Sequence, residues 1–121
     1  MPSGTYLPVQ PFILQDKLAG TPKENLRRMT FIGQMKRALL SIRTVLETAG
    51  GTAQDLTRLT WYITDKRDYV AKQKQVGDVY RKVLGSIFLT MTMVVVAGLV
   101  EDKTLVEIEA TAVIKIQQRV S

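Results

Sequence analysis

The 121-residue sequence contains no cysteine and no histidine. Their absence excludes disulfide bonds, thiolate nucleophiles, zinc sites built from Cys or His, and every mechanism that uses imidazole as a base. Any catalysis must therefore use carboxylates, hydroxyls, lysine, arginine or backbone groups. No apolar run reaches the roughly 18 residues of a membrane span, and the N-terminus lacks a signal-peptide pattern. These absences predict a cytoplasmic protein with no metal site.

The composition is that of one globular domain spanning residues 1–121. Hydrophobic residues make up 45% of the chain and charged residues 23%, which is too apolar and too evenly mixed for disorder. The formal net charge is +6, but the basic residues are spread over several segments without interleaved aromatics. Solvated faces explain them better than a nucleic-acid groove. We expect neither specific nucleic-acid binding nor membrane binding.

Apolar spacing predicts two helices and a strand between them. Thr30 can cap a first helix whose apolar positions run from Phe31 to Ala49 and which two glycines end. Residues 56–64 alternate between apolar and polar side chains, as in a half-buried strand. A second helix follows the turn at 65–68 and ends at Gly85.

Three further segments complete the predicted sheet. Residues 6–20 form a weak hairpin, followed by a loop at 21–28, and residues 91–100 and 105–117 form two strands that a hairpin at 101–104 joins. The order favours an α+β fold with one sheet and both helices on a single face. Because the run 91–100 is apolar on both faces, we expect its second face to meet another subunit.

Several motifs together resemble the Rid (reactive intermediate deaminase, YjgF-type) family. They are AGGTAQDL at 49–56 followed by LTWYITD at 59–65, VAGL at 96–99, and LVEIEATA at 105–112. The resemblance implies a chorismate-mutase-like fold in a homotrimer, with the sheets turned inward and a site between neighbouring subunits. It also implies cofactor-free hydrolysis of imines and enamines such as 2-aminoacrylate.

The same resemblance assigns the residues of the pocket. Glu107 stands where the family has a glutamate near the attacking water, and Thr92 lies beside the position of its arginine. Tyr6 matches the family's tyrosine, and Ala19 and Gly20 match its Ser-Gly pair. A rival register places residues 8–10 at that pair but replaces the glycine with valine.

Met91 stands at the arginine position, and this is the clearest departure from the family. Methionine offers neither a charge nor a hydrogen-bond donor to a substrate carboxylate. The substitution argues against deamination of amino-acid-derived imines and does not affect the predicted fold.

Each of these residues also has a structural interpretation. Glu107 can be a solvent-facing neighbour of Glu109 on an alternating strand, although two such carboxylates can also raise one pKa. Tyr6 can serve packing, Gly20 backbone conformation, and Met91 strand packing.

A set of apolar residues stands where the family commonly has polar residues or proline. On the first helix, the apolar Ile32 and Leu40 recur at helical spacing with Lys36 between them, opposite the predicted buried stripe. Ile87 and Leu89 follow the second helix. Together they suggest a contact with a second protein component.

Two hypotheses remain open at this level. The first is a trimeric assembly or binding module without efficient 2-aminoacrylate deaminase activity, whether natural or engineered as a subunit of a larger self-assembling complex. The second is an arginine-lacking hydrolase that acts on a neutral or cationic imine or enamine, with Glu107 as its polar centre.

Overall fold

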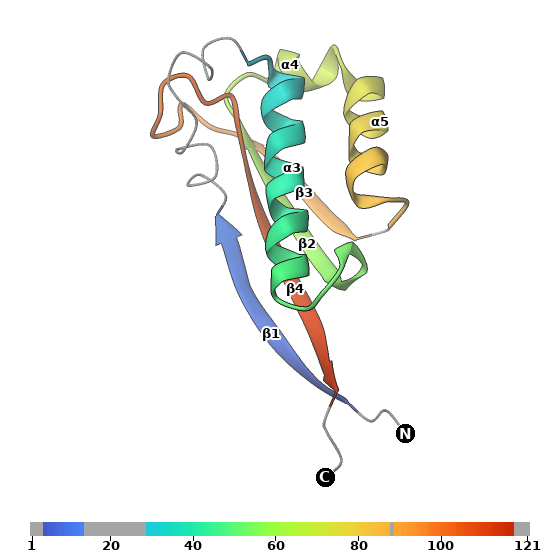
Figure 1. The fold of residues 1–121 in the computed structure, drawn as a ribbon. Coiled ribbons are helices and arrows are strands. Elements are labelled where there is room, and N and C mark those ends of the chain that lie inside the picture. Colours follow the sequence, from blue (N-terminus) through green and yellow to red (C-terminus); the bar gives the residue numbers. More distant parts are fainter. Residues whose placement is uncertain (1–3, 14–28, 88, 118–121) are drawn as a thin grey trace.

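The computed structural model describes the backbone of residues 4–13, 29–87 and 89–117. Figure 1 shows the helices and strands along the chain. Their order is β1 (Gly4–Ile13), α3 (Phe31–Thr48), the short 3-10 helix η1 (Ala53–Asp55), β2 (Leu56–Ile63), α4 (Lys66–Val70), α5 (Gln73–Leu84), β3 (Thr90–Val95) and β4 (Val106–Gln117).

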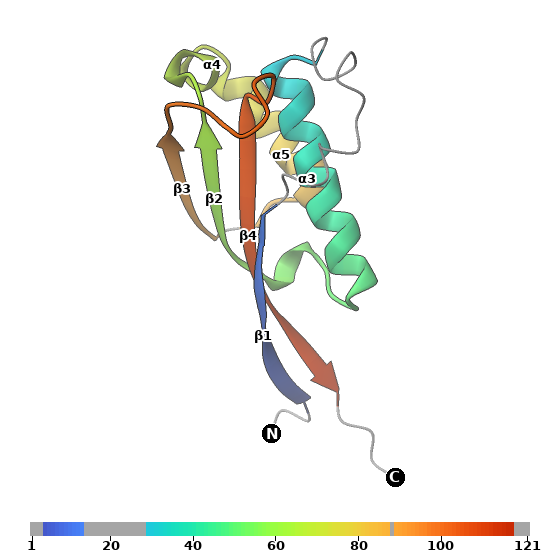
Figure 2. The same ribbon diagram turned by 90° about the vertical axis from the view of Figure 1, so that its left-hand side faces the viewer.

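The four strands form one mixed sheet in the order β1-β4-β2-β3. β4 is antiparallel to both β1 and β2, whereas β3 runs parallel to β2. Figures 1 and 2 show α3 and α5 side by side on the same face of this sheet. The predicted α+β architecture with both helices on one face is confirmed.

The hairpin predicted at residues 101–104 is wrong, because β3 and β4 are not neighbours. β2 lies between them in the sheet, and the chain after β3 crosses the end of β2 to reach β4. The Val96 N–H donates to the Ile63 carbonyl (2.8 Å), and the Thr64 N–H donates to the Leu105 carbonyl (3.3 Å). A parallel strand needs a crossover connection, which α4 and α5 supply, and this crossover moves β3 to the sheet edge.

Of the hairpin predicted at residues 6–20, the structure describes residues 6–13, which belong to the long strand β1. β1 pairs with β4 over most of its length, with an irregularity between Val9 and Phe12. The rest of the predicted hairpin, residues 14–20, and the predicted loop at 21–28 lie outside the described residues.

The helix α3 forms where its sequence predicts it. The Thr30 side chain accepts a hydrogen bond from the Gly33 N–H (3.1 Å) at the start of the helix, and Gly50, with φ of 87°, follows its end. Such a positive φ strains a residue with a Cβ. The buried stripe of the helix packs on β4 and β2, where Leu59, Trp61 and Ile63 are fully buried.

The second predicted helix is divided into α4 and α5. Asp65 caps α4 by accepting from the Arg67 N–H (2.9 Å), and Lys72, with φ of −129°, leaves the helical conformation before α5 begins. Gly85, with φ of 84°, ends α5 as expected. Among the apolar side chains that recur at helical spacing in this segment, Val76 and Val83 are buried, whereas Tyr69, Val79 and Tyr80 are half-buried.

Candidate functional site

Glu107 lies on β4, on the face of the sheet that the helices leave uncovered. Its neighbours Val106 and Ile108 are fully buried beneath the helices, so strand alternation turns Glu107 to the opposite face. Its side chain is half-buried, and this burial raises the pKa of the Glu107 carboxyl above its ordinary value of 4.5. A carboxyl with a raised pKa is better suited to general acid-base work near neutral pH.

Polar side chains accompany Glu107 on this uncovered surface, which we call the open face. The strand register pairs Glu107 with Tyr62, and in the next row it pairs Glu109 with Thr60 and Thr60 with Thr92. Thus Glu107 and Thr92, two of the predicted site residues, share a face. Because β2 separates their strands, their backbones lie at least about 10 Å apart.

Met91 faces the other way. It pairs with Leu59 across the β2–β3 ladder, and Leu59 is fully buried beneath the helices. Paired residues of neighbouring strands point to the same face. Met91 therefore lies on the helix face of the sheet, and within one protomer it does not join Thr92 and Glu107 in a single pocket.

Tyr6 is also distant from Glu107 within one protomer. Its backbone pairs with Lys115 near the far end of β4, eight residues from Glu107, or about 27 Å at the rise of a strand. Ala19 and Gly20 lie outside the described residues. A site that combines Tyr6 with Glu107 needs two protomers.

A cavity that the sequence did not predict lies between the β2–β3 edge and the helices α4 and α5. Its volume is about 170 Å³. The strands contribute Trp61, Met91 and Met93, and the helices contribute Tyr69, Gln73, Val76, Gly77 and Tyr80. Tyr69, Val76 and Tyr80 recur at helical spacing in the sequence, a pattern that describes a filled core equally well.

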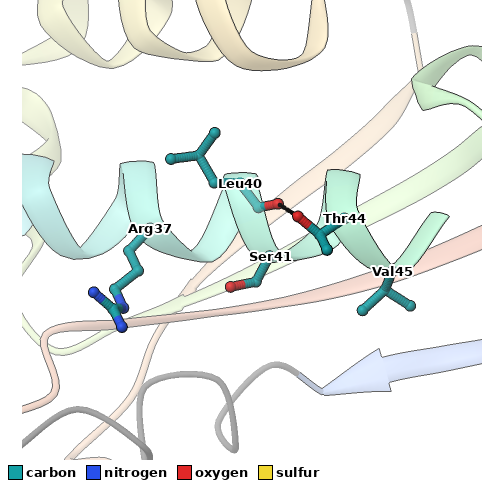
Figure 3. A pocket seen from close by; sticks show the side chains of 5 residues that line it. All are labelled: Arg37, Leu40, Ser41, Thr44 and Val45. Atoms are coloured by element: carbon teal, nitrogen blue, oxygen red, sulfur yellow. Dashed lines mark hydrogen bonds between the residues drawn. The ribbon is translucent and has the colours of Figure 1, made fainter. Parts of the chain in front are cut away.

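A second hollow, of about 320 Å³, follows the outer side of α3. In Figure 3, Arg37, Ser41 and Val45 point to the side where β1 lies, whereas Leu40 points the opposite way. Thr44 Oγ1 donates to the Leu40 carbonyl (3.0 Å), so this hydroxyl already has a partner. These described lining residues include no carboxylate, and the hollow lies on the other side of the sheet from Glu107.

The described residues contain no group of three Asp or Glu side chains that could hold a metal ion. Among the same residues, none of the helices combines the length and hydropathy that a membrane span requires.

Residues 17–114 match the family described as Endoribonuclease L-PSP. The chain belongs to this family. Its relatives include the YjgF and RidA proteins, so the resemblance to the Rid family is confirmed.

Solved structures of the L-PSP family share this fold. A member of the YjgF/YER057c/UK114 family from Mycobacterium tuberculosis is 29% identical, with a TM-score of 0.63 over 92% of this chain and 80% of that chain. RidA from the Antarctic bacterium Psychrobacter is 20% identical, with a TM-score of 0.67 over 93% and 86%. E. coli TdcF, solved with bound serine, is 21% identical, with a TM-score of 0.63 over 93% and 87%.

The apolar residues that we suggested for a contact with a second protein component are only partly exposed to solvent. Ile32, Leu40, Ile87 and Leu89 are all half-buried and pack against the core, and of the suggested set only Lys36 is exposed. The helix α5 covers the side of α3 that carries Ile32 and Leu40. Arg43 lies on this side of α3, and its Nη1 donates a hydrogen bond to the carbonyl of Val83 in α5 (3.2 Å). These four side chains are therefore less exposed than the sequence suggested, and a contact through them with a second protein component remains a prediction.

Proposed function

We propose that this L-PSP family member is a homotrimeric binding module that does not efficiently deaminate 2-aminoacrylate. The proposal is supported by Met91, which stands where the resemblance to the Rid family places the carboxylate-binding arginine. A methionine side chain cannot donate to a carboxylate. Each charge-assisted hydrogen bond from a guanidinium contributes about 1.5 to 3 kcal/mol, so a substrate carboxylate placed here is desolvated without compensation.

The position of Met91 adds to this argument. Its side chain lines a cavity with Trp61 and Met93, on the opposite face of the sheet from Glu107 and the exposed Arg58. The fold relative TdcF was solved with serine, a ligand that carries a carboxylate. We expect this chain to bind serine poorly.

The decisive assay generates 2-aminoacrylate in situ and follows pyruvate. We expect no clear increase over the uncatalysed rate with the wild-type chain and weak activity at most with Met91→Arg. Thr92→Arg is the matched control, because it adds the same cation one residue away on the opposite face. Robust wild-type turnover would show that another cation, such as Arg58, holds the carboxylate, and the proposal would be abandoned.

The trimer is supported by the apolar edge of the sheet. β3 is an edge strand on which Met91 is 45% exposed, Val94 39% and Val95 53%, and an exposed apolar edge is a template for pairing with another chain. Covering it recovers about 25 cal/mol for each Å² of apolar surface. The proposal is limited to the homotrimer, since the side chains suggested for a second protein component pack against the core.

Sedimentation at decreasing protein concentration tests the trimer. We expect a trimer at micromolar concentration and a loss of thermal stability on dilution, because subunit dissociation is linked to unfolding. A stable monomer at the same concentration would contradict this part of the proposal. A particle larger than a trimer would revive a second protein interface.

The raised pKa of Glu107 favours a second candidate function, a hydrolase for a neutral or cationic imine. Such an enzyme would add water to the C=N bond of the imine, or of the imine tautomer of an enamine, and the C–N bond would then break to release an aldehyde or ketone and ammonia. Glu107→Gln should then abolish turnover, whereas Glu109→Gln, on the same face two residues away, should retain most of it. Equal effects of the two substitutions would exclude Glu107 as the specific acid-base group.

A further inference from the structure

A row of side chains on the open face joins Glu107 to the apolar edge of the sheet. The strand register pairs Glu107 with Tyr62, and it pairs Tyr62 with Val94 on β3. Val94 is 39% exposed, whereas Tyr62 and Glu107 are half-buried. Because neighbouring strands lie about 4.8 Å apart, the backbones of Glu107 and Val94 are about 10 Å apart. A carboxyl group therefore stands two strands in from an edge that the proposed trimer covers.

A subunit contact of ordinary size reaches Glu107 from this edge. Such a contact buries about 800 Å² on each partner, which corresponds to a patch roughly 30 Å across. Figure 2 shows α3 and α5 on one side of the sheet, so neither of these helices covers the side that carries Glu107. A patch of that size centred on Val94 extends to Glu107.

The strands around Glu107 bring no cation close to its carboxyl group within one protomer. On β2, Arg58 is four residues from Tyr62, or about 13 Å along the strand. On β4, the next side chain on the same face is a second carboxylate, Glu109. β3 contains no charged residue. β1 contains none either, and its register ends with Ile13 opposite Glu109.

The segment before β4 does not supply a cation to the open face. It contains Glu101, Asp102 and Lys103, and the Lys103 carbonyl accepts a hydrogen bond from Gln34 Nε2 on α3 (2.9 Å), on the helix side of the sheet. Ion pairs among the described residues are formed by Arg43, Arg67 and Arg81. None of these pairs includes Glu107. Its carboxyl group is therefore partly desolvated without a compensating charge, in agreement with its raised pKa.

Covering the open face removes more water from this carboxyl group. Further desolvation raises the pKa of Glu107 in the assembled state above its value in the free protomer. Assembly then takes up protons, so it strengthens as the pH falls and weakens once Glu107 is ionised. The overall charge acts in the opposite direction, because a chain with a net charge of +6 becomes more positive in acid and repels its copies more strongly. Stronger assembly in acid therefore points to a desolvated carboxyl group.

We propose that Glu107 makes assembly of this chain pH-dependent, so that its copies associate more tightly in mild acid than at neutral pH. The inference rests on the proposed homotrimer and adds the regulation of its assembly. It assigns this role to Glu107 and not to Glu109. Glu109 is the diagonal neighbour of Arg58 across the β2–β4 ladder, at about 7 to 8 Å, where a guanidinium can compensate the charge of that carboxylate.

Sedimentation equilibrium of the full-length chain between about pH 5 and pH 7.5, at fixed ionic strength, measures the association constant. We expect it to rise at least about tenfold from the neutral to the acid end, since each Glu107 that takes up a proton contributes up to about tenfold per pH unit. Glu107→Gln should associate more tightly than the wild type at neutral pH and lose the dependence. The matched control Glu109→Gln should retain it. Circular dichroism at each pH establishes that every variant is folded.

A pH dependence that is lost in Glu107→Gln and kept in Glu109→Gln supports the proposal. If Glu107→Gln does not fold, NMR titration of the wild-type Glu107 carboxyl decides it, because the midpoint must rise with protein concentration as the subunits associate. Constant association, or the same dependence in Glu107→Gln, overturns the proposal. Association that strengthens with rising pH also overturns it and identifies a cation of another copy beside Glu107. A monomer at every pH overturns the homotrimer as well, so the two failures are distinguishable.

Discussion

Gln34 is a buried polar side chain that joins α3 to the segment before β4. It is 0% exposed, its Nε2 donates to the Lys103 carbonyl (2.9 Å), and its Oε1 accepts from the Leu105 N–H (2.7 Å). The substitution Gln34→Met keeps the length of the side chain and removes these two hydrogen bonds together with a longer one from Nε2 to the Met29 carbonyl (3.5 Å). Each bond contributes about 0.5 to 1.5 kcal/mol, and backbone groups left unpaired add a desolvation cost.

We expect Gln34→Met to lower the free energy of unfolding by about 2 kcal/mol. The loss is limited because Lys103 is exposed and Leu105 half-buried, so water can bind part of the backbone groups that lose their partner. Urea denaturation followed by circular dichroism, at one fixed protein concentration, measures the change. Gln75→Met is the matched control at an exposed helical position, with an expected change below about 0.5 kcal/mol. If Gln34→Met also changes the free energy of unfolding by less than about 0.5 kcal/mol, the amide of Gln34 does not stabilise the attachment of the segment before β4.

Two further predictions test the burial of other side chains. Replacing both Ile32 and Leu40 with glutamate should lower the free energy of unfolding by about 2 to 4 kcal/mol, since both side chains pack against the core. The control Lys36→Glu, at an exposed position, should change it little. If the double variant is as stable in urea as the wild type, Ile32 and Leu40 do not contribute to the core. Glu107→Gln should stabilise the chain increasingly as the pH rises above 4.5, because burial raises the folded-state pKa and ionisation of Glu107 therefore costs stability. A difference between Glu107→Gln and wild type that is constant across the acid range would contradict the burial of this carboxyl.

Local patterns predicted the elements whose partners lie close in sequence or whose periodicity is strong. Thr30 and the apolar spacing of α3 located that helix, and the alternation of Leu59, Trp61 and Ile63 identified both β2 and its buried face. The pairing of strands was less accessible. The local sequence of residues 91–100 and 105–117 is typical of a hairpin. The parallel pairing of β3 with β2 is a tertiary interaction that local turn residues do not predict.

The candidate site was predictable to a similar extent. Alternation places Glu107 and Glu109 on one face and Val106 and Ile108 on the other, as observed. The side to which Met91 points depends on its register with Leu59, which the sequence alone does not supply. The burial of Ile32 on α3 likewise depends on where α5 packs. The periodicity of one helix predicts the direction in which a side chain leaves the helix axis, but not which element lies beside it.

The separation of these residues links assembly to any chemistry that uses them together. Tyr6 and Glu107 lie about 27 Å apart along β4, and Met91 is on the opposite face of the sheet from Glu107. An activity that needs Tyr6 and Glu107 must therefore draw them from two protomers and must decline on dilution as the subunits dissociate.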